Sequence, residues 1–141
     1  MKSLFFCFTA LLFSLTLWAQ DPADIFYRTI PMDSVEELSL SVYPNDSLAV
    51  QVWPGNHLMI ETSVMLYNGK QRILEFMKEQ GRWDFTDELA GKRLTLVSKD
   101  QERRLVKSDR GSMTEDVVIV IYVPEDFEAI DQLNWRRKEP K

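Results

Sequence analysis

Cysteine and histidine are almost absent from this sequence of 141 residues, which holds only Cys7 and His57. Residues 1–19 have the pattern of a leader that export removes, so the mature chain would keep His57 and no cysteine. That composition excludes disulfides, thiolate metal sites, cysteine nucleophiles and zinc sites built on two histidines. The sequence therefore predicts neither a metal site nor a cofactor.

An excess of positive charge is also missing. The chain has 17 Lys and Arg residues against 22 Asp and Glu, a net charge of −5, and removing residues 1–19 with Lys2 makes it −6. Nucleic-acid binders carry the opposite sign, so nucleic acid is excluded as a partner. With 45% apolar and 28% charged residues, the composition is that of an ordinary globular protein. The length after removal of the leader suits one domain and not two.

Residues 1–19 predict a cleavable export signal. Lys2 supplies the positive start, and Leu4 to Trp18 is an apolar run broken only by Thr9, Ser14 and Thr16. Ala19 is a small residue before a cleavage point at Gln20. The apolar run is shorter than the roughly 20 residues that span a bilayer. No cysteine follows the cleavage point to carry lipid. We expect an exported protein, periplasmic or secreted, without a stable membrane anchor.

From Val35 onward, apolar and polar residues alternate with a period of two, which predicts β-strands near residues 38–42, 48–52 and 58–66. The turns between them contain Tyr43-Pro44 and Trp53-Pro54. A repeat of ten residues fits either an up-and-down meander or the first rungs of a β-solenoid. The expected fold is a single, mostly β domain over residues 35–135, preceded by an extended lead-in over residues 20–34.

One short helix is predicted between Gly69 and Gly81. Asn68 and Gln71 have the spacing of a capping box at its start, and Gly81 suits a left-handed stop. Its apolar side is expected to contain Ile73, Leu74, Phe76 and Met77.

The C-terminal part predicts the centre of the core. Val117 to Val123 is apolar at every position, so we expect the central strand with both faces covered. Residues 82–90 should form a loop or a short edge strand, and residues 99–116 a long polar excursion. Residues 136–141 are expected to be a basic disordered tail.

These segments together resemble a family of exported bacterial proteins, the adhesin-like group described as auto-transporter adhesin, head GIN domain. The resemblance rests on Val50 to Asn56, on the helix before Arg82-Trp83, and on Glu115 to Pro124, and it covers Val35 to about Ile130. It implies a right-handed β-solenoid without established functional residues. Its members continue with more strand-turn repeats, so the chain resembles the entry module of such a protein.

Three aromatic residues form the candidate binding surface: Tyr43, Trp53 and Trp83. Flat rings stack on sugar faces or anchor protein contacts. The leading hypothesis is a non-catalytic, adhesin-like protein of the cell envelope that binds protein or glycan through its β surface. The competing interpretation of these rings is that they cover the ends of the core.

Two other functional hypotheses stay open. One is a small carbohydrate-active enzyme that uses Asp84, Asp87 or Glu88, since paired carboxylates hydrolyse glycosidic bonds. The spacing of a calcium loop is absent there, and a solvated loop is the plainer interpretation. His57 has no mapped acidic partner and is expected to be a surface turn residue. The other hypothesis is a truncated remnant of a longer β-solenoid protein.

Self-association is expected at the C-terminal end. A stack of strands that stops shortly after Pro124 leaves its last layer uncovered. The apolar residues that remain to cover it are the candidate interface: Phe127, Ile130, Leu133 and Trp135.

Overall fold

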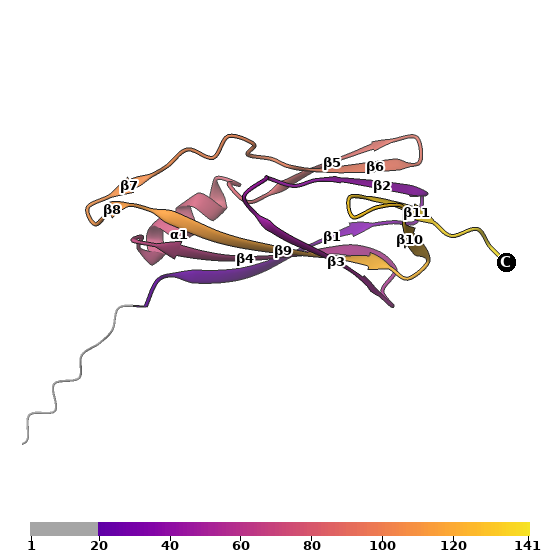
Figure 1. Ribbon diagram of the computed structural model, residues 1–141, viewed down its shortest axis with the longest axis horizontal. Coiled ribbons are helices and arrows are strands. Elements are labelled where there is room, and N and C mark those ends of the chain that lie inside the picture. Colours follow the sequence, from indigo (N-terminus) through magenta and orange to yellow (C-terminus); the bar gives the residue numbers. More distant parts are fainter. Residues whose placement is uncertain (1–19) are drawn as a thin grey trace, which may run out of the picture.

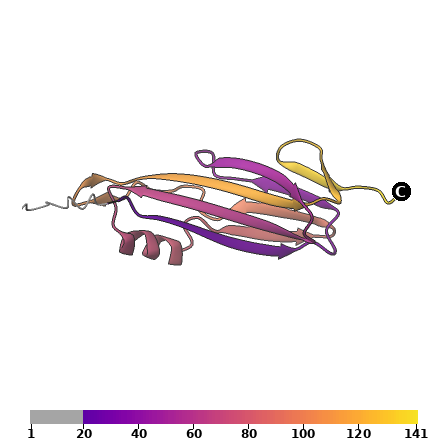
Figure 2. The same cartoon turned by 90° about the horizontal axis from the view of Figure 1, so that it is seen from below.

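The computed structural model describes residues 20–141 (Figure 1). The predicted export signal, residues 1–19, lies outside the described residues. Within residues 20–141, two main β-sheets share one hydrophobic core, and a single helix lies at one end (Figures 1 and 2). The protein is therefore a mostly β, single-domain structure, as the sequence predicts.

Sheet A has four strands in the order β1 (Ala23–Pro31), β4 (His57–Tyr67), β9 (Thr114–Pro124) and β3 (Ser47–Trp53). β4 is antiparallel to both β1 and β9, whereas β3 runs parallel to β9. Ile121 at the middle of β9 lies opposite Ile60 on one side and Val50 on the other. β4 and β9 are thus interior strands, and β1 and β3 are the edges.

Sheet B has five strands in the order β10 (Phe127–Ala129), β11 (Asn134–Arg137), β2 (Glu37–Ser41), β6 (Arg93–Ser98) and β5 (Phe85–Ala90). Its β2–β6 pair is parallel and the other pairs are antiparallel. A small separate hairpin joins β7 (Lys107–Ser108) to β8 (Gly111–Ser112). Residues 82–90 end in the edge strand β5, one of the two predicted alternatives.

The three strands of the ten-residue repeat do not form a meander. β2 belongs to sheet B and β3 to sheet A, and β9 lies between β3 and β4. The turn after β2 carries the chain from one sheet to the other, so β2 does not pair with β3. Local spacing determines where strands end, but the packing of their apolar faces determines their partners. This order does not confirm a solenoid.

β9 is the predicted interior strand, but only one of its faces is buried. Ile119, Ile121 and Val123 are at most 1% exposed, whereas Val118 on the other face is 40% exposed. Because sheet B covers sheet A on one side only, the prediction of a doubly covered strand is wrong. Side chains alternate across a strand, so every second residue of β9 contacts the core.

Both predicted irregular ends contribute strands. The extended lead-in contains β1, all of which pairs with β4, and its Ile30 is buried. At the other end, Arg136 and Arg137 belong to β11 and not to a disordered tail. The guanidinium of Arg137 lies 4.6 Å from the centre of the Phe127 ring and donates to the carbonyl of Val35 at 2.9 Å. Backbone pairing and this contact hold a basic residue that composition alone assigns to solvent.

The helix α1 (Gln71–Glu79) is shorter than predicted. Lys70 is its N-cap without a side-chain hydrogen bond, and Asn68 takes a positive φ of 59°, so the capping box does not form. Gly81 has the predicted left-handed φ, 74°. Leu74 is buried, but Phe76 is 59% exposed. Within residues 20–141, no helix has the length and apolar content to cross a membrane.

Candidate functional site

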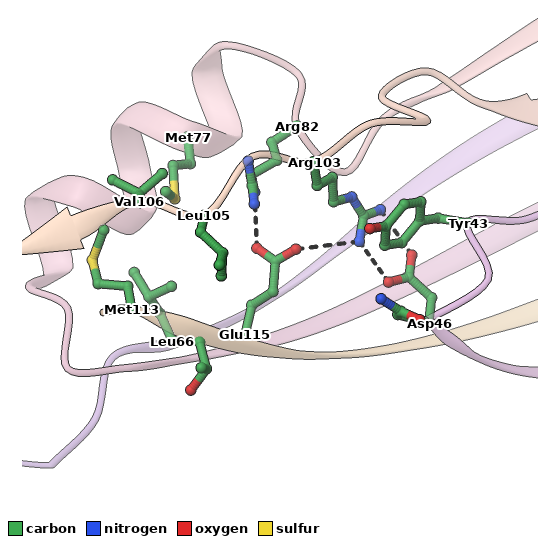
Figure 3. A pocket seen from close by; sticks show the side chains of 12 residues that line it. Tyr43, Asp46, Leu66, Met77, Arg82, Arg103, Leu105, Val106, Met113 and Glu115 are labelled. Carbon is green, nitrogen blue, oxygen red and sulfur yellow. Dashed lines mark hydrogen bonds and ion pairs between the residues drawn. The ribbon is translucent and has the colours of Figure 1, made fainter. Parts of the chain in front are cut away.

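A cavity of about 380 Å³ lies between the β2–β3 turn, α1 and the irregular segment that follows β6 (Figure 3). Its volume falls in the range typical of small-molecule sites. The ends of β4 and β9 form its floor through Leu66, Thr114 and Glu115. Segments far apart in the sequence therefore meet around one space.

One wall of the cavity is apolar and the other is polar. The apolar wall consists of Leu66, Met77, Leu105, Val106 and Met113. The polar wall consists of Tyr43, Asn45, Asp46, Arg82, Arg103 and Glu115. Leu105 is 77% exposed and lies where the cavity meets solvent. The site thus presents an apolar surface opposite planar groups that donate and accept hydrogen bonds.

Four residues of the polar wall form a row of alternating charges, joined by the contacts drawn in Figure 3: Arg82, Glu115, Arg103 and Asp46. Arg103 contacts Asp46 through two nitrogen–oxygen pairs, at 2.5 Å and 2.8 Å. Glu115 accepts from Arg82 Nε at 2.8 Å and from Arg103 Nη1 at 3.4 Å. Two guanidinium groups balance two carboxylates, so the row is electrically neutral as a whole.

The pair of Arg103 and Asp46 is deeply buried, with side-chain exposures of 3% and 2%. Burial raises the pKa of Asp46 above its ordinary value, against the opposing effect of Arg103. The Tyr43 ring lies 4.4 Å from the Arg103 guanidinium carbon and stacks beneath it. The Nε of Arg103 is buried without a hydrogen-bond partner, which is uncommon for a charged donor.

Strand geometry explains why Glu115 lies here. Side chains two residues apart in a strand share a face, and Glu115 lies two residues before the buried Val117 and four before the buried Ile119. The Glu115 side chain therefore points to the core side of β9. A carboxylate in that position requires partners, and three donors supply them. Besides the two arginines, Trp83 Nε1 donates to Glu115 Oε2 at 3.2 Å.

The three predicted binding aromatics do not share a surface. Tyr43 lines the cavity, as described above. Trp83 is only 1% exposed, and burial in the core beside Glu115 makes it unable to contact an external partner. Trp53 lies on the outer face of sheet A, where its ring centre is 6.0 Å from Tyr122 and 4.9 Å from His57.

His57 begins β4 and is held by its neighbours. Its ring Nδ1 lies 3.1 Å from the side-chain oxygen of Asn56, and its carbonyl accepts from Trp53 Nε1 at 3.0 Å. His57 directly follows the turn after β3, but it is a half-buried strand residue and not a surface turn residue.

The three carboxylates of the enzyme hypothesis do not converge. Asp84 precedes β5, and Asp87 and Glu88 are consecutive residues of that strand, so their side chains point to opposite faces. Asp87 is paired with Arg28 of β1. None of the three lines the cavity. In the part of the chain that the structure describes, no three Asp, Glu or His residues are grouped as a metal site.

The four residues of the predicted C-terminal interface separate into two pairs. Phe127 and Trp135 are 1% and 8% exposed and belong to the core, whereas Ile130 and Leu133 are 61% and 41% exposed. The chain returns after Pro124 as the β10–β11 hairpin, and β11 pairs with β2. This hairpin extends sheet B sideways, so no uncovered last layer exists there.

Sequence reasoning did not identify the charged row. Asp46 and Arg103 are separated by 57 positions, and Arg103 lies in a segment where charged residues are frequent. The one available signal was Glu115, a carboxylate at a core-facing position of an apolar strand.

Comparisons with known proteins give no relative: no family model matches the chain, and searches of curated proteins and of solved structures find no match. The resemblance to the adhesin-like group therefore stays a prediction.

Proposed function

We propose that this chain is an exported, non-catalytic, adhesin-like protein of the cell envelope, and that it binds a glycan in the cavity beside Arg103. The observation that carries the proposal is a cavity of about 380 Å³ in which a charge-balanced polar wall lies opposite an apolar wall. At the rim of the cavity, the exposed Asn45 and Leu105 offer a ligand one hydrogen-bonding side chain and one apolar side chain.

The neutrality of the polar wall favours an uncharged ligand. Positive and negative side chains alternate along the row from Arg82 to Asp46. An ion of either sign in the cavity would therefore be attracted by two of these side chains and repelled by the other two. A sugar carries hydroxyl groups that both donate and accept, and its ring has apolar C–H faces. Such a molecule matches the planar polar groups on one side and Leu105 with Met113 on the other.

Binding without catalysis agrees with the state of the two cavity carboxylates. Each is held by a guanidinium group, Asp46 by Arg103 and Glu115 by Arg82. An acid–base pair for glycoside hydrolysis requires one carboxylic acid and one free carboxylate on either side of the bond. Carboxylates engaged in ion pairs serve better as fixed acceptors for hydroxyl groups.

The test is a screen of the full chain, purified after export, against an array of neutral and acidic oligosaccharides, followed by calorimetry with the strongest binder. We expect a neutral saccharide to bind. Asn45→Ala and Leu105→Ala change exposed residues of the cavity rim and should each weaken binding about tenfold.

Ile130→Ala is the matched control, because Ile130 is exposed and lies outside the cavity lining. It should leave saccharide affinity unchanged. Absence of binding to every saccharide, or equal losses in Ile130→Ala and Leu105→Ala, would overturn the proposal. Cleavage of a bound oligosaccharide would replace it with the enzyme hypothesis.

A further inference from the structure

The four edge strands of the two sheets differ in how they are protected. β1 carries Asp24 and Arg28, β5 carries Asp87 and Glu88, and β10 has only three residues, among them Glu128. β3 reads Ser-Leu-Ala-Val-Gln-Val-Trp over seven residues without a charge or a proline. Charges, proline and short length are the usual means of preventing edge pairing, and β3 has none of them.

The side chains of β3 also show an open edge. Leu48, Val50 and Val52 are on the core side of sheet A, in line with Ile119, Ile121 and Val123 of the adjacent β9. The β9 residues are fully buried, whereas Leu48 and Val50 are half-buried and Val52 is 55% exposed. Figure 2 shows β3 along the margin of sheet A opposite β1. The apolar core layer therefore reaches solvent at this edge.

We propose that β3 is a self-association site, where a second copy of the chain adds its own β3 in antiparallel orientation. A two-fold axis at Val50 pairs Ser47 with Trp53, Leu48 with Val52, and Ala49 with Gln51 of the partner. All seven residues of the strand are paired in this register, and the two four-stranded sheets become one continuous sheet of eight strands.

A second copy fits because β3 is complementary to itself. In the two-fold register, Leu48 of each copy covers the exposed Val52 of the other, and the large Trp53 faces the small Ser47. No charged side chain of one β3 meets the other. For a chain of net charge −6 over residues 20–141, an uncharged edge is a surface where two copies can approach with little repulsion.

The inference is independent of the proposed glycan site. Asp46 directly precedes β3, so the two cavities would lie near opposite ends of the paired strands. The two Ser47 residues would be about 20 Å apart along the strand direction, at about 3.3 Å per residue. A dimer of this geometry presents two separate cavities.

The first test is sedimentation equilibrium of the full chain purified after export, compared with Val52→Lys and Ile25→Lys. Both substitutions place a lysine on an exposed residue of an edge strand, 55% exposed in β3 and 56% in β1. The parent chain and Ile25→Lys should dimerise, and Val52→Lys should dissociate at least tenfold more readily, with unchanged circular dichroism. A monomeric parent chain, or equal weakening by both lysines, would overturn the proposal.

Cysteine pairing tests the register. In a Cys7→Ser background, which leaves no other thiol, Ala49→Cys and Gln51→Cys place single cysteines on exposed residues of β3. In the proposed register, residue 49 of one copy lies directly opposite residue 51 of the other, about 4.5–5.5 Å away and within disulfide range. Two copies of the same variant would instead place their cysteines in diagonal positions, which are farther apart. A mixture of the two variants should form a mixed disulfide in preference to either like pair. Preference for like pairs would exclude the two-fold axis at Val50.

Discussion

The buried pair of Arg103 and Asp46 gives a sharp test of the charged row. Both side chains are almost fully enclosed, at 3% and 2% exposure, so removing one partner leaves the other as a buried charge. Losses of this kind cost about 3–5 kcal/mol, whereas replacing both partners by apolar residues is often neutral. We expect Asp46→Leu and Arg103→Met each to lower the free energy of unfolding by about 3 kcal/mol or more, and the double variant to stay within about 1 kcal/mol of the parent.

The pH dependence of Arg103→Met has a definite sign. Burial already raises the pKa of Asp46, and removal of the guanidinium that opposes this effect should raise it further. A carboxyl with a raised pKa in the folded state binds its proton more tightly there than in the unfolded chain. The loss of stability in Arg103→Met should therefore be largest at pH 7 and should shrink as the pH falls toward the ordinary value of 3.8.

Urea denaturation followed by tryptophan fluorescence measures both effects, because buried Trp83 donates to Glu115 of the same row. Single variants that cost less than about 1 kcal/mol, or a double variant whose loss equals the sum of the two, would refute the reasoning. If the loss of unfolding free energy in Arg103→Met grew as the pH fell, the buried Asp46 carboxylate would not be the group responsible for that loss.

Three further predictions address the core, a turn and the leader. Ile121→Ala, at a residue with no exposed surface, should cost about 2–5 kcal/mol in urea denaturation, and Val118→Ala on the outer face of the same strand less than about 0.5 kcal/mol; equal losses would show that both faces of β9 are covered. The hydrogen bond from the Asn134 side chain, together with the Leu133 amide, holds the pKa of Asp131 below 3.8, so its contribution is present above that pH and lost as the pH falls through the folded-state pKa. The melting temperatures of Asp131→Ala and the parent should therefore differ at pH 7 and approach each other as the pH falls below 3.8; a gap that stays constant as the solution is acidified would contradict this. Mass analysis of the exported protein should find Gln20 as the first residue, and a retained Met1–Ala19 segment would refute cleavage.

Much of the secondary structure follows from local pattern. Period-two alternation locates β2, β3 and β4, and the apolar run of Val117 to Val123 locates the interior strand β9. The left-handed Gly81 correctly ends the helix. These features depend on neighbours within a few residues, which is why one sequence suffices to find them.

The arrangement of the strands could not be obtained in the same way. Nothing local to the Tyr43–Asp46 turn indicates that the chain changes sheets there, so a repeat of ten residues suggested adjacent strands. The β10–β11 hairpin returns Trp135 to the core through pairing with β2, nearly a hundred positions earlier in the chain. Pairing between segments so far apart depends on how the whole core packs, so the local sequence pattern does not predict it.

Of the residues that line the cavity, only Tyr43 was among the binding residues predicted from the sequence. Its partners Asp46 and Arg103 are joined across 57 positions, and no spacing rule connects an arginine in an irregular segment to a turn aspartate. Trp83 shows the opposite error, a residue predicted for the binding surface that lies in the core. Its charged neighbours in the sequence suggested exposure, and only the structure shows its burial.

The most direct test of glycan binding is an NMR titration that follows the side-chain Nε–H signal of Arg103. Arg103 lines the cavity and pairs with Asp46 and Glu115 on its polar wall. Addition of the neutral saccharide that binds most tightly on the array should shift this signal by changing the environment of the Arg103 guanidinium, while the Nε–H signal of the exposed Arg110 stays unchanged. An unshifted Arg103 signal at saturating saccharide, or shifts confined to the outer face around Trp53, would contradict a glycan site in this cavity.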